Sequence, residues 1–157
     1  MFDTPATGPL AGIVVADFSR ILAGPYATML LADLGATVIK VEGPPLGDDT
    51  RSWIPPVTGD GTATYYLSIN RNKRSIVLDL RDADDVALAR RLAARADVLI
   101  ENFKPGGLTR FGLDHPAVSA VNPGVVYCSI SGFGPDGGAA LPGYDLLVQA
   151  TSGLMSV

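Results

Sequence analysis

Cysteine and histidine are almost absent from this chain of 157 residues. The lone cysteine, Cys128, excludes an intrachain disulfide, and its place in the apolar run of residues 125–130 indicates a small buried side chain rather than a nucleophile. The lone histidine, His115, stands between Asp114 and Pro116, which is typical of a surface loop. Because histidine, cysteine and carboxylate residues nowhere have metal-ligand spacing, we expect no metal site.

Long apolar runs and an excess of positive charge are also missing. No stretch approaches the roughly 20 apolar residues of a membrane-spanning helix, and residues 1–5 lack the basic and apolar regions of a signal peptide. A formal net charge of −4 argues against a nucleic-acid partner, although it leaves room for a local basic pocket. We therefore expect a cytoplasmic protein with neither a nucleic-acid nor a membrane partner.

Short apolar runs alternate with segments of helical periodicity along the chain. The runs expected to form buried strands are residues 12–18, 37–42, 75–80, 98–103 and 125–130. Helices are expected over residues 24–34 and 83–96, with shorter helical pieces near 108–111 and 116–122. This alternation is typical of βαβ units, so the sequence predicts an α/β fold with a Rossmann-like, mostly parallel sheet flanked by helices.

The segments that follow the expected strands are candidates for a ligand site. In open parallel sheets, ligands bind in a crevice beyond the carboxyl ends of the strands. The segments expected to line one crevice are residues 19–24, 42–43, 80–81, 102–107 and 131–134.

A glycine-rich motif, Gly132-Phe133-Gly134-Pro135-Asp136-Gly137, follows the last expected strand. It matches the dinucleotide fingerprint G-x-G-x-x-G, which requires a helix to begin inside the motif. Pro135 and the glycines and proline that follow it forbid a regular helix here. A mobile loop that closes over a substrate fits this segment better than a nicotinamide or flavin site.

Basic residues cluster in residues 70–75, just before an expected strand. A solvated turn is the common explanation, but Arg81, Lys104 and Arg110 follow at or near other strand ends. Several cations around one crevice in an acidic protein favour a polyanionic small molecule. The helix start at Gly24-Pro25 is either an anion site or an ordinary turn.

Two further segments leave alternatives open. The loop of residues 43–62 is long enough to be functional, or else it is a disordered surface excursion. Near the end of the chain, Asp145 is either a base, a nucleophile or a ligand contact, or it caps the following helix, which its residue type favours. The apolar residues 153–157 indicate that this end docks into a core or continues further.

Together these segments resemble the family III CoA-transferases, a group that includes formyl-CoA transferase, carnitine CoA-transferase and α-methylacyl-CoA racemase. The matching pieces, in the family's order, are PLAGIVVADFSRILAGP, LADLGATVIKVEGPPLGDDTR, YYLSINRNKRSIVLDL, ADVLIENFKPG, NPGVVYCSISGFGPDG and PGYDLLVQATSG. The resemblance implies that residues 1–157 form part of a coenzyme A-binding large domain, with the rest of that domain and a small domain lying outside them.

The resemblance also implies the contacts of coenzyme A. They are expected at Leu22, Ala23, Leu78, Asp79, Leu80, Arg81, Asn102, Phe103, Lys104, Arg110, Gly143 and Tyr144. The long loop with Asp48, Asp49, Arg51 and Trp53 is expected near the coenzyme A and acyl portion.

For the chemistry, the resemblance implies CoA transfer between an acyl-CoA donor and a carboxylic acid acceptor through an aspartyl-CoA intermediate. The nucleophilic aspartate is expected about thirty residues beyond Tyr144, and therefore beyond Val157, so residues 1–157 are expected to be inactive alone. Tyr144 and Asp145 are expected near the thioester. Tyr144 occupies a position where racemase members carry a histidine, which favours a transferase. The alternatives are a racemase-like enzyme and a non-catalytic CoA-binding module. The full-length form is expected to be an interlocked homodimer.

Overall fold

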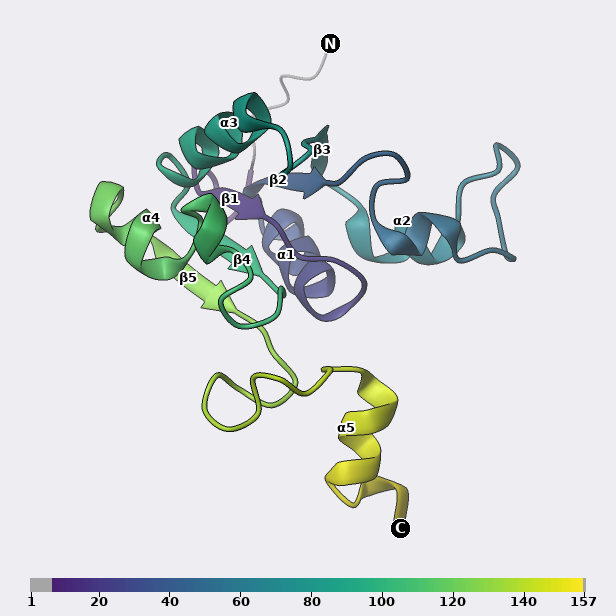
Figure 1. The fold of residues 1–157 in the computed structure, drawn as a ribbon. Coiled ribbons are helices and arrows are strands. Elements are labelled where there is room, and N and C mark those ends of the chain that lie inside the picture. The colour runs from purple at the N-terminus through teal and green to yellow at the C-terminus, as the bar shows by residue number, and fades with distance from the viewer. Residues whose placement is uncertain (1–6, 157) are drawn as a thin grey trace.

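One parallel sheet forms the centre of the protein in a computed structural model that describes residues 7–156 (Figure 1). Within that range its strands are β1 (Val14–Asp17), β2 (Thr37–Glu42), β3 (Arg74–Val77), β4 (Val98–Glu101) and β5 (Val126–Ser129). The α-helices are α1 (Ala23–Asp33), α2 (Thr64–Asn70), α3 (Ala83–Ala93), α4 (His115–Val121) and α5 (Asp145–Thr151). All neighbouring strands are parallel, in the order β3-β2-β1-β4-β5, which confirms the predicted α/β class.

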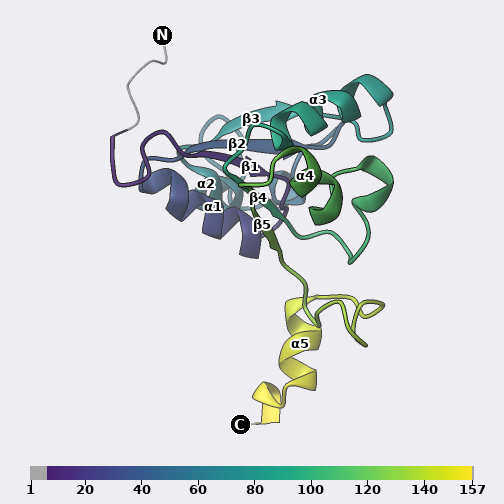
Figure 2. The ribbon, with the colours of Figure 1, turned by 90° about the vertical axis from the view of Figure 1, so that its left-hand side faces the viewer.

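Helices cover both faces of the sheet (Figure 2). On one face, α1 packs on a core that includes Val15 and Ile100. On the other face, Ala16 and Leu99 belong to a second core that α3 and α4 cover. Neighbouring residues of a strand point to opposite faces, so the continuous apolar runs of β1 and β4 supply both cores.

Successive strands are added first on one side of β1 and then on its other side, so the direction of strand addition reverses at the middle of the sheet. From β1 the chain passes through α1 to β2, whereas it passes from β3 through α3 to β4 on the other face. The central strand β1 pairs with β2 on one side and with β4 on the other. Beyond the carboxyl ends of β1 and β4, the departing loops therefore separate, which is where such sheets hold a crevice.

Helix α3 begins and ends with charges that suit its dipole. Asp82 caps it by accepting hydrogen bonds from the backbone N–H groups of Asp84 and Asp85, and Arg90 and Arg91 occupy its last turn. The predicted end of this helix is Ala96, but the helix ends at Ala93. Strand β3 is likewise shorter than predicted, because the Asp79 backbone N–H leaves the sheet to donate to Asp85 Oδ2 (2.8 Å).

Helix α2 has no counterpart among the predicted elements. It begins after Ala63 without a side-chain cap, and its sequence TYYLSIN is rich in residues that favour strands. Tyr66 and Ile69 are buried, and α2 packs against α1. Tertiary packing rather than intrinsic propensity therefore accounts for this helix.

The end of the described chain forms an arm that extends away from the sheet (Figure 1). As predicted, no helix begins within the glycine-rich motif, and α5 starts only at Asp145. The capping prediction for Asp145 is wrong, because Tyr144 occupies the N-cap position and Asp145 accepts a hydrogen bond from Gln149. Leu146 and Leu154 are exposed on this arm, as is Tyr144.

Candidate functional site

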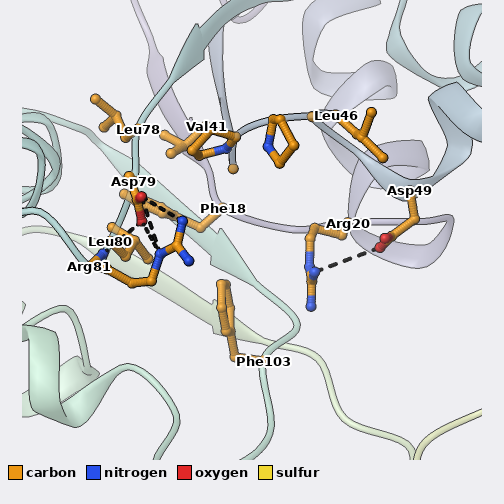
Figure 3. Close-up of a pocket in the computed structure, with 14 residues that line it drawn as sticks. Phe18, Arg20, Val41, Leu46, Asp49, Leu78, Asp79, Leu80, Arg81 and Phe103 are labelled. Atoms are coloured by element: carbon orange, nitrogen blue, oxygen red, sulfur yellow. Dashed lines mark hydrogen bonds and ion pairs between the residues drawn. The ribbon is translucent and has the colours of Figure 1, made fainter.

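A cavity of about 460 Å³ lies beyond the carboxyl ends of the strands (Figure 3). Its lining residues are Phe18, Arg20, Val41, Gly43, Pro44, Pro45, Leu46, Gly47, Asp49, Leu78, Asp79, Leu80, Arg81 and Phe103. They come from the ends of β1, β2 and β4, from the segment after β3 and from the long loop that follows β2. A volume of this size is typical of small-molecule sites.

The cavity combines apolar walls with charged side chains. Phe18, Val41 and Leu78 belong to the core between the sheet and α3, so this core is open to the cavity at the edge of the sheet. The guanidinium of Arg20 lies 5.5 Å from the centre of the Phe103 ring. An aromatic ring and an arginine side by side offer a stacking surface for a planar group and hydrogen-bond donors for an anion.

Each arginine of the cavity already has an aspartate partner. Arg81 Nη2 lies 2.8 Å from Asp79 Oδ2, and Arg20 Nη1 lies 3.6 Å from Asp49 Oδ2. Hydrogen bonds from Arg81 lower the pKa of Asp79 to about 2, so this carboxylate is ionised at neutral pH. Both arginines are largely exposed and have guanidinium N–H groups beyond those used in these pairs, so they can bind an anion without leaving their partners.

The structure brings some of the predicted coenzyme A contacts into this cavity and leaves others outside its lining. Those that line it are Leu78, Asp79, Leu80, Arg81 and Phe103. Those that do not are Leu22, Ala23, Asn102, Lys104, Arg110, Gly143 and Tyr144.

Most of the residues outside the lining lie near it in the chain. Leu22 and Ala23 lie at the start of α1, and the Asn102 side chain holds the backbone of Arg20, which itself lines the cavity. Lys104 directly follows Phe103. Their contact with coenzyme A stays a prediction.

The remaining predicted contacts lie elsewhere in the structure. Arg110 stacks on the neighbouring ring of Phe111, and Gly143 and Tyr144 belong to the C-terminal arm. The predicted crevice is confirmed for the segments after β1 to β4. Residues 131–134, after β5, contribute no lining residue.

The basic cluster of residues 70–75 does not serve the cavity. Lys73 is buried, donates to Pro25 O (2.7 Å) and pairs with Asp17 (3.1 Å) beneath the start of α1. Burial lowers the pKa of Lys73 to about 8. Arg71 pairs with Asp33 at the end of α1. Both interpretations of this cluster, a solvated turn and a phosphate site, are therefore wrong for Lys73, which stabilises the fold.

Polar side chains of β1 and β2 form a buried network on the sheet face that α1 covers. Asp17 accepts hydrogen bonds from Thr28 of α1 (2.6 Å) and from Ser19. Lys40 pairs with Asp48 at 2.8 Å, with both side chains almost fully buried. Within the described residues every buried side-chain nitrogen and oxygen has a hydrogen-bond partner, as the burial of so many polar groups requires.

This network fixes the long loop after β2. Arg51 donates from Nε and Nη2 to both oxygens of Glu42 (2.7 Å each), and Tyr66 and Ser75 also donate to Glu42. The loop contains a 3₁₀ helix, Asp49–Ser52, so it is neither structureless nor a disordered excursion. The buried Asp48 and the partly exposed Arg51 hold the loop in place, while Asp49 lines the cavity. This buried network was not predicted from the sequence. One feature of the sequence indicates it: the charged residues Lys40 and Glu42 interrupt an apolar strand at a spacing of two.

The ionisation of Glu42 predicts a stability change in acid. Burial alone would raise the pKa of Glu42, but the hydrogen bonds from Arg51, Ser75 and the Asp48 backbone lower it to about 2. The unfolded chain has the ordinary value near 4.3, so between these pH values the unfolded state binds more protons. We expect the urea concentration at the midpoint of unfolding to stay constant above about pH 5 and to fall as the pH drops from about 4.5 towards 2.

The variant Glu42→Gln isolates this contribution. It should be less stable than the wild type at pH 7, and its stability should fall less steeply in acid. Asp136→Asn, on the exposed glycine-rich segment, is the matched control and should keep the wild-type profile. Equal acid dependence of Glu42→Gln and wild type would contradict the role given to this carboxylate.

The described part of the chain contains neither a candidate metal site nor a candidate membrane span. Across residues 7–156 no three histidine, cysteine or carboxylate side chains gather where they could hold a metal ion. The helices in the same range are all too short or too polar to cross a membrane.

Comparison with known proteins identifies relatives over almost the whole chain. The model of CoA-transferase family III matches residues 10–157. The chain is 53% identical over 155 residues to the succinate–glutarate CoA-transferase of Agrobacterium fabrum, covering 95% of this chain and 39% of that protein. It is 49% identical over 150 residues to human succinyl-CoA:glutarate CoA-transferase, covering 95% of this chain and 34% of that one.

A solved structure agrees with the fold described above. The crystal structure of a CAIB/BAIF family protein from Brucella suis superposes with a TM-score of 0.90 at 50% identity, covering 96% of this chain and 40% of that one. The chain thus spans well under half the length of the relatives it matches. The family match over residues 10–157, the identities near 50% and the shared fold lead to one conclusion. The chain belongs to CoA-transferase family III.

Proposed function

We propose that residues 1–157 supply a coenzyme A-binding part of an enzyme that moves CoA between an acyl-CoA donor and a carboxylate acceptor. The observation that carries the proposal is the cavity at the edge of the sheet. The expected contact segment Leu78–Arg81 and Phe103 meet there with Arg20. An apolar wall, an aromatic ring and two arginines suit a molecule that joins an adenine ring to phosphate groups.

Short dicarboxylates are the proposed acyl groups. The two relatives described above, at 53% and 49% identity, are named for succinate and glutarate. A third relative, 46% identical, is named acetyl-CoA:oxalate CoA-transferase and is from Acetobacter aceti. The proposed reaction is the reversible transfer of CoA between succinyl-CoA and glutarate.

The proposed chemistry uses an aspartate outside residues 1–157. Its carboxylate attacks the thioester carbonyl of the donor, and CoA leaves as a thiolate, which gives a mixed anhydride. The thiolate then attacks the aspartyl carbonyl and releases the donor carboxylate, which leaves an aspartyl-CoA thioester. The acceptor carboxylate repeats both steps in reverse and departs as the new thioester. Such covalent catalysis divides one difficult exchange into easier steps.

Tyrosine at position 144 supports transfer over racemisation. A racemase needs acid and base groups that exchange protons near neutral pH. The histidine that the resemblance implies at this position in racemase members suits that task, whereas a tyrosine phenol is a poor base there. The exposed apolar side chains of the arm, Leu146 and Leu154 among them, are consistent with an interlocked homodimer of the complete protein. Sedimentation analysis of the complete protein tests that assembly.

The complete protein, mixed with succinyl-CoA and glutarate, should form glutaryl-CoA, which chromatography with mass detection measures. With acyl-CoA alone, intact-protein mass spectrometry should detect a covalent CoA adduct. CoA binding without product or adduct would contradict transfer and favour a non-catalytic CoA-binding module. Exchange of the α-proton of an acyl-CoA with deuterated water would favour a racemase instead.

Arg81→Ala tests the cavity itself. We expect CoA to bind about tenfold more weakly, because a hydrogen bond to a charged group contributes about 1.5 kcal/mol or more. Titration calorimetry of the complete protein measures this change. Arg91→Ala, on the exposed end of α3, is the matched control and should bind CoA like the wild type. Equal affinity of Arg81→Ala and the control would place CoA elsewhere.

A further inference from the structure

The turn between β1 and α1 contains a backbone conformation that its sequence does not favour. Ile21 has a φ of 69°, in the left-handed region. A β-branched side chain is strongly disfavoured there, since its Cβ substituents clash with the backbone. Such a conformation persists only where the surroundings hold it.

Neighbouring side chains fix the backbone on the strand side of Ile21. The Asn102 side chain accepts from the Arg20 N–H (2.9 Å) and donates to the Arg20 carbonyl (2.7 Å). Lys40 donates from Nζ to the Ser19 carbonyl (2.9 Å), and the Ser19 N–H donates to Asp17 Oδ1 (3.0 Å). Both residues before Ile21 are therefore held from two sides.

Ile21 itself is held by the long loop. Its N–H faces the Asp48 carboxylate, with 3.3 Å to Oδ2 and 3.4 Å to Oδ1. Asp48 is fixed in turn by the ion pair with Lys40 and by hydrogen bonds from the N–H and hydroxyl of Thr50 (3.0 and 2.7 Å). Burial by itself would raise the pKa of Asp48, but its bonds to Lys40 and Thr50 lower it, so a charged carboxylate faces this N–H.

The turn sets the position of residues at the cavity. Arg20, directly before Ile21, lines the cavity beside Phe103 and pairs with Asp49, the neighbour of Asp48. Leu22 and Ala23, directly after it, start α1, and no side chain caps that start. A change at Ile21 would therefore turn Arg20 and the beginning of α1 relative to each other.

We propose that Asp48 is a positioning residue for coenzyme A binding. Asp48 holds Ile21 in the left-handed conformation, and this conformation fixes the positions of Arg20 and of the start of α1. Both positions therefore depend on the long loop being in the conformation that places Asp48 beside Ile21. Asp48 does not line the cavity and acts through the backbone of the turn. This inference rests on the proposed binding of coenzyme A in the cavity.

The test uses Asp48→Asn and Ile21→Gly in the complete protein. Asparagine keeps the size and an acceptor oxygen but removes the charge opposite Lys40. We expect Asp48→Asn to weaken CoA binding about tenfold in calorimetry and to raise KM for the acyl-CoA by a similar factor, with kcat nearly unchanged. Glycine adopts positive φ without strain, so the double variant should regain CoA affinity to within about threefold of the wild type. It should not regain the thermal stability lost with the ion pair.

Asp60→Asn, exposed on the same loop, is the matched control and should keep the wild-type affinity. Wild-type affinity of folded Asp48→Asn would overturn the inference. So would an affinity loss that Ile21→Gly does not restore, because Asp48 would then affect CoA binding by a route other than the conformation of Ile21. If the wild type itself fails to bind CoA, the proposed function is overturned and this inference with it.

Discussion

Lys40→Met is expected to lower the free energy of unfolding by about 3–5 kcal/mol, the usual cost of removing one partner of a buried ion pair. Methionine is similar to lysine in length and leaves little cavity, so the loss is mainly electrostatic. Asp48 stays behind, buried and without its cation, and the Ser19 carbonyl loses its donor. For a chain of this size the melting temperature should fall by roughly 10 °C. Urea unfolding followed by circular dichroism measures the free energy of unfolding, and thermal unfolding measures the melting temperature.

The exposed ion pair of Arg71 and Asp33 provides the matched control. Its distance, 2.6 Å between Arg71 Nη2 and Asp33 Oδ2, is similar to the 2.8 Å of the Lys40 pair, but its arginine is about half exposed. Exposed pairs contribute at most about 1 kcal/mol, so Arg71→Met should have a small effect. Equal losses in both variants would contradict the description of Lys40 as part of a buried network.

Gly24→Ala is expected to destabilise the protein by about 3 kcal/mol, at the upper end of the usual cost of overpacking. Helix propensity alone predicts the opposite, since alanine favours helices over glycine by about 1 kcal/mol. However, a Cβ on Gly24 would overlap the Cβ and Oγ atoms of Ser19. Ser19 cannot move away easily, because Asp17 and Lys40 hold it. Steric overlap therefore outweighs propensity, and CoA affinity should fall as the turn is displaced.

Two further variants separate steric overlap from other effects of alanine. Ser19→Gly removes the atoms that the new Cβ would meet, so the double variant should be more stable than the sum of the two single losses predicts. Gly124→Ala places a Cβ where no atom lies within 4 Å and should be nearly neutral. Strict additivity of Ser19→Gly and Gly24→Ala would show that the two positions do not meet.

The sheet could be predicted from the sequence because its strands are apolar and separated by clear helix signals. Strand β2 has the predicted bounds, Thr37–Glu42, since Gly35 lies just before it and Gly43 and two prolines follow it. The crevice followed from topology, because parallel strands bring their carboxyl ends to one edge. That argument placed Arg81 and Phe103 correctly although more than twenty residues separate them.

Other features depend on contacts between distant residues and could not be read locally. Helix α2 exists because Tyr66 and Ile69 are buried, although its residues favour a strand. Lys73 looked like a candidate ligand for phosphate, whereas its partner is Asp17, which lies 56 positions away in the chain. A charge in a sequence does not show whether it faces solvent, a ligand or another buried charge.

The order of the cavity's residues along the chain has a consequence for biosynthesis. All of its lining residues but Phe103 lie between Phe18 and Arg81, and Phe103 follows β4. Because a chain emerges from the ribosome with its N-terminus first, every wall of this cavity has been synthesised before α4, β5 and the arm exist. We therefore expect nascent chains that end shortly after β4 to contain all the residues that line the cavity.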